Sequence, residues 1–218
     1  MGFDFSIPWF KAQNFDIVID IGAHEGEYSL EFHKLWPEAE IYAFEPVPEC
    51  FKVLSERFSE QGENLHCYNV ALGSYNHTAN FYINNFTYAS SLLPMEPLHI
   101  QVFPQSEKFT RKAVEVRTLD SYLYFEKNIL NKKIFIKVDV QGYEDAVLSG
   151  GINTLKHSNL VIIEVSFQPL YRGQSTFDSV YAIMKNCGFN FMGIFDQLVN
   201  PADRSVLQGD CIFLKGQS

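Results

Sequence analysis

The chain has 218 residues, of which 46% are hydrophobic and 15% aromatic. This length supports one compact core and is short for two, so we expect a single domain over residues 1–218. The formal net charge is −9 and the Lys and Arg residues form no run, which argues against a nucleic-acid partner.

The first ten residues are apolar but lack the basic stretch and the cleavage site of a secretory signal. We interpret them as a segment that docks onto the domain. No run approaches the roughly 20 apolar residues that cross a bilayer, so no membrane span is expected. The cysteines form no C-x-x-C pair, which favours reduced thiols in a cytoplasmic protein.

The first part of the chain alternates between strand-like and helix-like segments. The pattern predicts strands at residues 15–21, 41–44 and 65–72 and helices at residues 28–35 and 48–62. The first strand is rich in β-branched residues and ends at Gly22, as a strand buried on both faces should. Such alternation predicts parallel strands with helices on both faces, a doubly wound α/β sheet.

The alternation breaks in the middle of the chain. Two strand-like segments, 79–83 and 113–117, flank a long irregular stretch, which predicts an inserted hairpin around residues 78–117 that carries a lid-like loop. Regular elements then return, with strands expected at 134–138, 160–165, 191–195 and 210–214 and helices at 144–148 and 177–186.

A glycine loop directly follows the first strand. It runs from Asp20 to Gly26 and precedes a helix, where a ligand must approach the backbone closely. His24 stands where the dinucleotide-binding pattern has its second glycine, so close passage of a pyrophosphate is poorly supported. A Gly-x-x-x-Gly element taken alone is equally compatible with an ordinary tight turn.

An acidic residue ends the second strand. Glu45 follows Asp20 by 25 residues, where a carboxylate would accept hydrogen bonds from both hydroxyls of a ribose. The alternative is a solvated turn residue. A nicotinamide-dependent oxidoreductase would share the strand, loop, helix and acidic strand end, and it stays open as an alternative at this point.

Together with later motifs, these residues resemble the FkbM-type methyltransferase family. The motifs, in that family's order, are Asp20 to Gly26, Ala43 to Pro46, Asn69 to Gly73, Ser90 to Leu92, Arg117 to Asp120, Ile136 to Glu144 and Ile163-Glu164. The most specific is the Lys-x-Asp-x-x-Gly-x-Glu element, and the resemblance covers about residues 15 to 215. The family usually has Asn at His24 and Glu at Gln141, which weakens any proposal of a metal held by paired carboxylates, and no metal is assigned.

The resemblance implies a class I methyltransferase fold, which is a doubly wound, mostly parallel, seven-stranded α/β sheet. It also implies S-adenosylmethionine as the cofactor and a small hydroxylated acceptor such as a sugar or polyketide, O-methylated by the enzyme. The donor-binding residues that it implies are Asp20, Gly22, Ala23, His24, Gly26, Glu45, Pro46, Asn69, Val70, Ala71 and Asp139. His24 alternatively contacts the acceptor or only hydrogen-bonds its own turn.

Two acids after the fourth strand are candidates for the general base. Asp139 and Glu144 flank a turn at Gly142 that would bring both to one cleft. In the alternative, Asp139 binds only the donor's ammonium group and Glu144 only caps the following helix. Tyr88, Ser90 and Ser91 lie in the insertion and could reach over the donor as a lid, or only cover the edge of the sheet.

A catalytically silent binding module with the same fold is a further alternative. It predicts a decayed donor site, whereas the acids and glycines of that site are all present. The chain begins almost at the first strand, so a second subunit could complete the acceptor pocket, and a homo-oligomer is compatible with this expectation. The identity of the acceptor is not encoded in any motif.

Overall fold

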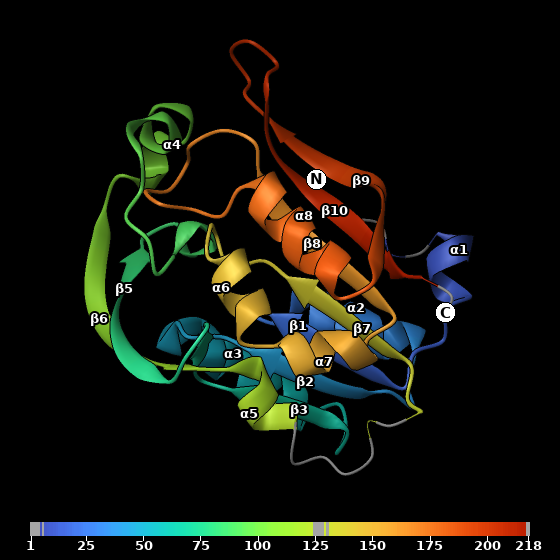
Figure 1. Ribbon diagram of the computed structural model, residues 1–218. Coiled ribbons are helices and arrows are strands. Elements are labelled where there is room, and N and C mark those ends of the chain that lie inside the picture. The colour runs from blue at the N-terminus through green and yellow to red at the C-terminus, as the bar shows by residue number, and fades with distance from the viewer. Residues whose placement is uncertain (1–4, 6, 124–128, 130, 217–218) are drawn as a thin grey trace.

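The computed structural model describes residues 5, 7–123, 129 and 131–216. The strands of its main sheet are β1 (Ile17–Ile21), β2 (Glu40–Phe44), β3 (Leu65–Tyr68), β7 (Ile134–Val138), β8 (Leu160–Ser166), β9 (Phe189–Val199) and β10 (Val206–Lys215). They lie in the order β3-β2-β1-β7-β8-β10-β9 (Figure 1). All neighbours are parallel except β10, which runs antiparallel to β8 and β9. The predicted fold class, a mostly parallel seven-stranded sheet, is confirmed.

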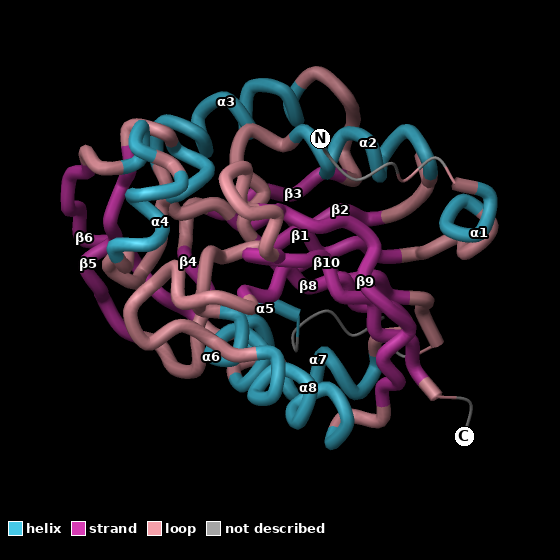
Figure 2. Tube along the Cα trace, turned by 90° about the horizontal axis from the view of Figure 1, so that it is seen from above, coloured by secondary structure: helices cyan, strands magenta, loops and turns pink. Residues whose placement is uncertain are grey.

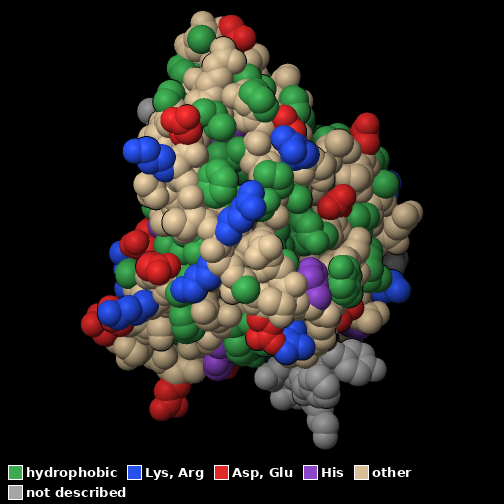
Figure 3. All heavy atoms as spheres, turned by 90° about the vertical axis from the view of Figure 1, so that its left-hand side faces the viewer, with side chains coloured by type: hydrophobic (Ala, Val, Ile, Leu, Met, Phe, Trp, Pro, Cys, Tyr) green, Lys and Arg blue, Asp and Glu red, His purple; other side chains and the backbone are tan. Residues whose placement is uncertain are grey.

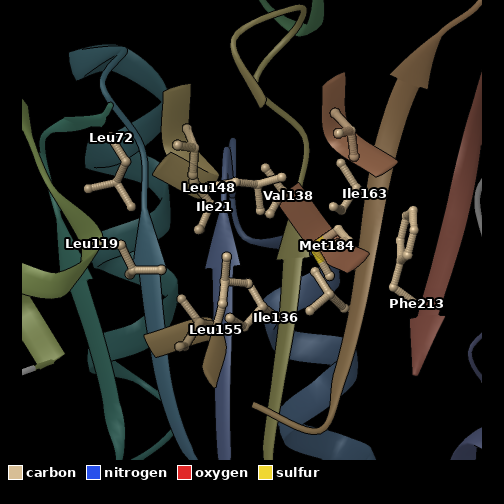
Figure 4. Packing of buried hydrophobic residues seen from close by; sticks show 14 of the residues in the cluster. Ile21, Leu72, Leu119, Ile136, Val138, Leu148, Leu155, Ile163, Met184 and Phe213 are labelled. Atoms are coloured by element: carbon tan, nitrogen blue, oxygen red, sulfur yellow. The ribbon is translucent and has the colours of Figure 1, made fainter. Parts of the chain in front are cut away.

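Helices cover both faces of this sheet (Figure 2). One face carries α1 (Pro8–Lys11), α2 (Glu27–Leu35) and α3 (Pro48–Ser59), and the other carries α5 (Leu119–Leu123), α6 (Glu144–Ser149), α7 (Ile152–His157) and α8 (Phe177–Asn186). Successive side chains of a strand point to opposite faces of the sheet, so β1 contributes to the hydrophobic core on each face. Ile19 and Ile21 belong to the cluster under α6–α8, and Val18 belongs to the cluster under α1 and α2. Figure 4 shows the first cluster, in which strand side chains such as Ile136 meet helix side chains such as Leu155.

The insertion forms a second, smaller sheet. Its strands are β4 (Ala71–Leu72), β5 (His77–Asn84) and β6 (Phe109–Arg117), in the order β4-β6-β5, with β5 and β6 antiparallel. Between β5 and β6 lie the short helices η1 (Thr87–Ala89), α4 (Pro97–Val102) and η2 (Pro104–Ser106). The side of the molecule that carries this sheet mixes hydrophobic side chains with charges of both signs (Figure 3). The predicted hairpin insertion is present.

The prediction of one continuous third strand over residues 65–72 was wrong. β3 ends at Tyr68 and stays in the main sheet, whereas Ala71 and Leu72 pair with Val116 and Arg117 of β6. At the break, the side-chain amide of Asn69 donates to the carbonyl oxygen of Glu45 at 2.8 Å. The apolar run is continuous in sequence, so its periodicity could not show that its two halves belong to different sheets.

The described part of the N-terminal segment packs onto the domain. Phe5 and Phe10 are fully buried, and the Phe10 ring lies 5.2 Å from that of Phe135, edge to face. Residues 1–4 and 6 of the predicted docking segment lie outside the described residues. Within the described ranges, no helix is long and apolar enough to cross a membrane. The four cysteines are free thiols.

Candidate functional site

The glycine loop turns tightly at the carboxyl end of β1. Gly22 has a φ of +81°, and a Cβ atom there would lie 1.8 Å from the carbonyl oxygen of Asp139. Both the left-handed backbone and the close approach to β7 therefore require glycine. The amide nitrogens of Gly22 and Ala23 donate to the carbonyl oxygen of Phe44, which ties the loop to the end of β2.

The Glu45 carboxylate is fixed by backbone amides. Its Oε1 accepts from the Val47 amide nitrogen at 2.6 Å, and its Oε2 accepts from the His24 amide nitrogen at 2.9 Å. Burial nevertheless raises the pKa of Glu45 to about 7, helped by the nearby charges of Asp20 and Asp139 and opposed by the two amides. The solvated-turn interpretation is wrong, because Glu45 is only 5% exposed.

A cleft opens where the loop meets these strand ends, and we call it the glycine-loop cleft. It has a volume of about 630 Å³, the space open to solvent included. Gly22 and Glu45 lie on one side of it, and an apolar wall made by Val70, Ala71 and Leu72 lies on another. Small-molecule sites are typically apolar with a few placed polar groups, and this lining has that character.

Residues of the insertion form the roof of this cleft. The Tyr88 ring stacks on the His24 ring with 4.0 Å between centroids, and Thr87 Oγ1 lies 2.7 Å from His24 Nε2. Tyr88, Thr87 and Ser90 all line the cleft, and Tyr88 is still 55% exposed. Two of the three residues predicted for a lid, Tyr88 and Ser90, thus line the cleft, and their role over a bound donor stays a prediction.

Asp139 lies at the end of β7 with a defined set of partners. Its Oδ2 accepts from Lys137 Nζ at 3.1 Å and its Oδ1 from Gln141 Nε2 at 2.9 Å. Burial opposes ionisation of Asp139, but the charge of Lys137 and these hydrogen bonds outweigh it and lower the pKa. The carboxyl group is therefore a charged acceptor that faces the cleft.

Gln141 connects this acid to a buried network. Its Nε2 also donates to Glu164 Oε2 at 2.6 Å, and its Oε1 accepts from the Tyr171 hydroxyl at 2.9 Å. That hydroxyl lies 3.2 Å from Nε2 of His99 on α4, whose pKa burial lowers to about 4. A glutamate at position 141 could not donate in this way unless protonated, so the neutral amide holds two carboxylates in place.

Several predicted site residues lie outside the lining of the glycine-loop cleft. Asp20 is fully buried on the α2 side of β1, where its Oδ2 accepts from Ser29 Oγ at 2.6 Å; burial raises its pKa, opposed chiefly by the charge of Lys137. Gly26 turns against Leu54, and Ser91 Oγ donates to the carbonyl oxygen of Gln141. The remaining two hold the strand ends together: the backbone amide of Ala23 donates to the carbonyl oxygen of Phe44, and the side-chain amide of Asn69 donates to the carbonyl oxygen of Glu45.

The two acids after β7 are not brought to one cleft. Glu144 is 2% exposed at the start of α6, and its Oε1 accepts from the Gly142 amide nitrogen at 2.9 Å. Burial raises its pKa to about 7. Only Asp139 of the pair lines the glycine-loop cleft.

Sequence reasoning missed Tyr171 and His99 and assigned no role to Glu164. Glu164 follows the same rule as Glu45 and Asp139, since it lies near the carboxyl end of a parallel strand. Tyr171 lies outside the helices and His99 on the short helix α4, far apart in sequence, and no local pattern indicates that they meet.

The comparisons with known proteins agree with this geometry. The Methyltransferase FkbM domain matches residues 20–191. The chain belongs to the FkbM methyltransferase family. The predicted family is confirmed, and with it S-adenosylmethionine as the cofactor that the family uses.

This FkbM family member is similar to two characterised relatives. It is 27% identical over 164 residues to the 2-O-methyltransferase NoeI of Sinorhizobium fredii, covering 72% of this chain and 66% of NoeI. It is 25% identical over 155 residues to the hexuronic acid methyltransferase AglP of Haloferax volcanii, covering 71% of this chain and 58% of AglP. The match thus spans less than two thirds of the length of either relative.

A solved structure shares the fold. The crystal structure of a protein described as a putative S-adenosylmethionine-dependent methyltransferase from Listeria monocytogenes superposes with a TM-score of 0.51. The identity is 8%, and the match covers 94% of this chain and 93% of that one. At such identity the likeness supports the fold alone.

Proposed function

We propose that the protein transfers a methyl group from S-adenosylmethionine to a hydroxyl group of a small, sugar-like acceptor. The observation that carries this proposal is the Glu45 carboxylate, buried beside an apolar cleft and oriented by two backbone amides. A carboxylate so placed can accept both hydroxyls of a ribose, and the apolar wall at Val70 and Ala71 suits an adenine ring.

The cleft fits the donor in further respects. A side chain at Gly22 would clash with the Asp139 carbonyl, so the loop is held close to β7 and leaves its backbone open to the ligand. Two acids, Asp139 and Glu45, line the cleft and would attract a donor that carries a positive sulfonium and an ammonium group. Tyr88 and Thr87 line the cleft from the insertion, where they would shield a bound donor from part of the solvent.

In the reaction, S-adenosylmethionine supplies an electrophilic methyl group to an oxygen nucleophile. We assign Asp139 as the general base, because it is the charged carboxylate that lines the cleft. Each of its oxygens accepts one hydrogen bond from Lys137 or Gln141 and keeps a further lone pair for the acceptor's hydroxyl proton. Lys137 and Gln141 fix the carboxylate, and such positioning can lower the activation barrier by several kcal/mol.

The names of the relatives support the acceptor class. One is a 2-O-methyltransferase and the other methylates a hexuronic acid, so an oxygen on a sugar-like molecule is the acceptor that they favour. Glu144 has no catalytic role in this proposal, because its carboxyl group lies outside the lining of the cleft and accepts a hydrogen bond from the Gly142 amide.

Calorimetric titration with S-adenosylmethionine and its demethylated product tests the donor site. We expect micromolar binding of both ligands to the wild-type protein, loss of binding in Glu45→Ala, and unchanged binding in Glu63→Ala, which removes an exposed acid of the same type. NADH serves as the competing ligand. Binding of NADH in place of S-adenosylmethionine would favour the oxidoreductase, and binding of neither would favour the silent module.

A further inference from the structure

A second cleft lies beside the hairpin of β9 and β10, and we call it the hairpin cleft. Its floor is formed by Lys137, Asp139 and Glu164 at the ends of β7 and β8. Phe5 and Tyr28 stand on one side, and residues 196–199 and 208–210 of the hairpin stand on the other. The volume is about 1050 Å³, the space open to solvent included.

The hairpin cleft adjoins the glycine-loop cleft at one residue. Asp139 lines both clefts. A molecule in the hairpin cleft therefore lies next to the residue that we assign as the base.

The polar lining of the hairpin cleft is mostly acidic. Asp196 and Asp210 on the hairpin join Asp139 and Glu164 of the floor, and Lys137 is the one basic side chain among the described lining residues. Lys137 is 4% exposed, donates to Asp139, and lies with its Nζ 4.9 Å from the centre of the Tyr28 ring. Its charge is thus already engaged before any ligand enters.

One of the two amide side chains in the lining is engaged in the same way, since Gln208 Nε2 donates to Glu164 Oε2 at 2.7 Å. The other, Gln197, is exposed and uncharged. The carboxylate of Asp210 makes no hydrogen bond to a described residue. The lining therefore offers carboxylate acceptors to a ligand, while the one cation among the described lining residues is already paired.

Burial makes two acids of this cleft hard to ionise, and their neighbours' negative charges add to the effect. Burial raises the pKa of Asp210 to about 6; Lys137 opposes that rise, and Asp139 and Asp196 add to it. Burial and the charges of Asp139 and Asp210 raise the pKa of Glu164 well above its ordinary value. A further negative charge in this cleft would meet the same repulsion.

We propose that the hairpin cleft binds the methyl acceptor and selects a polyhydroxylated molecule that is uncharged or bears a protonated amine, and that it excludes uronic acids. The assignment rests on the proposed methyl transfer. Hydroxyl groups can donate to Asp196 and Asp210, an ammonium group would gain a charged partner in Asp210, and a carboxylate would find no free cation among the described lining residues. This selectivity differs from that named for the relative AglP.

Three sugars with one ring framework test the proposal: the methyl glycosides of glucose, glucosamine and glucuronic acid. Their binding is measured directly by saturation-transfer NMR, with the protein loaded with S-adenosylhomocysteine, and methyl transfer from labelled S-adenosylmethionine is followed in parallel. We expect the glucosaminide and the glucoside to bind, and the glucuronide to bind at least about tenfold more weakly than the glucosaminide. Equal or tighter binding of the glucuronide, or no binding of any of the three, overturns the proposal.

The variant Asp210→Asn ties the selectivity to the cleft. It should lower the preference for the glucosaminide over the glucuronide by about tenfold and leave the affinity for S-adenosylmethionine unchanged. Asp178→Asn removes the same charge from the exposed start of α8 and should change neither quantity. An unchanged preference in Asp210→Asn contradicts the proposal.

Failure of the donor site is distinguishable from failure of this inference. Sugar binding is observed on the protein itself and needs no turnover. A protein that binds the sugars in the expected order but does not bind S-adenosylmethionine contradicts the proposed function and leaves the selectivity of the hairpin cleft standing.

Discussion

The two clefts on either side of Asp139 are built in different ways. The glycine-loop cleft takes its shape from backbone: amides of His24 and Val47 hold Glu45, and Gly22 touches the Asp139 carbonyl. The hairpin cleft takes its character from side chains on elements distant in sequence, such as Tyr28 and Asp210. Recognition of a constant donor can rest on backbone geometry, whereas recognition of a particular acceptor rests on side chains that are easily exchanged.

The largest expected effect breaks the backbone-built cleft. Gly22→Ala adds a Cβ atom 1.8 Å from the Asp139 carbonyl oxygen, at a φ of +81°. We expect a loss of about 4 kcal/mol or more in the free energy of unfolding and loss of donor binding. Gly173→Ala is the matched control, because its φ is +72° but its Cβ would meet nothing within 4 Å. It should cost about 1 kcal/mol in urea denaturation. Similar losses in both would show that the close approach is unimportant.

The next effect concerns the residue shared by both clefts. Asp139→Asn keeps the shape of the side chain and removes its charge, so turnover should fall at least about a hundredfold while the affinity for S-adenosylmethionine changes by about threefold or less. Single-turnover kinetics and calorimetry separate the two quantities. Persistent turnover with donor affinity lost would make Asp139 a donor-binding residue and leave the base unassigned.

A pH titration sharpens the role of Glu45. Its pKa is raised to about 7, so the ionised form that accepts two hydroxyls dominates only above that pH. Affinity for S-adenosylmethionine should be constant above pH 7.5 and fall about tenfold per pH unit below pH 6.5. Calorimetry across pH 5.5 to 8.5 measures this. In Glu45→Gln the affinity should be weak at every pH, and an unchanged pH profile in that variant would assign the titration to another group.

The smallest effect separates Glu144 from catalysis. The pKa of its buried carboxyl is raised to about 7, so the folded state binds more protons than the unfolded state between pH 4.5 and 7. This contribution is fully present below pH 4.5 and is lost as pH rises through 7. The free energy of unfolding of the wild type should therefore fall between pH 5 and pH 8. In Glu144→Gln this fall should be smaller by about 1 to 3 kcal/mol, as measured by denaturant titrations at both pH values. Turnover of the folded variant should stay within about threefold, and a hundredfold loss would restore Glu144 as a catalytic candidate.

The sequence predicted the fold and the glycine-loop cleft well, because both depend on local pattern. Helix 177–186 and the strands around Asp20 and Asp139 follow from periodicity, glycines and strand ends. The break after Tyr68 and the short helix α7 did not follow, since the first depends on pairing with β6 and the second on the amides of Asn153 and Thr154 that donate to Asp120.

The hairpin cleft could not be predicted in the same way. Asp196 and Asp210 lie in segments whose pattern indicates only strands, and their approach to Lys137 depends on the order of β8, β10 and β9. A single-domain organisation, a cytoplasmic location and a homo-oligomer stay predictions. The predicted roles of the site residues in binding the donor and in catalysis also stay predictions.

The short strand β4 binds the insertion to the body of the protein. Because Ala71 pairs with Val116 of the insertion and also lines the glycine-loop cleft, part of the wall of that cleft belongs to the same sheet as the strands that flank the roof. The insertion is therefore not a detachable module. Deleting residues 78–117 to make a minimal enzyme would strip β4 of its partner, and grafting this insertion onto a related domain would succeed only if residues 69–73 were transplanted with it.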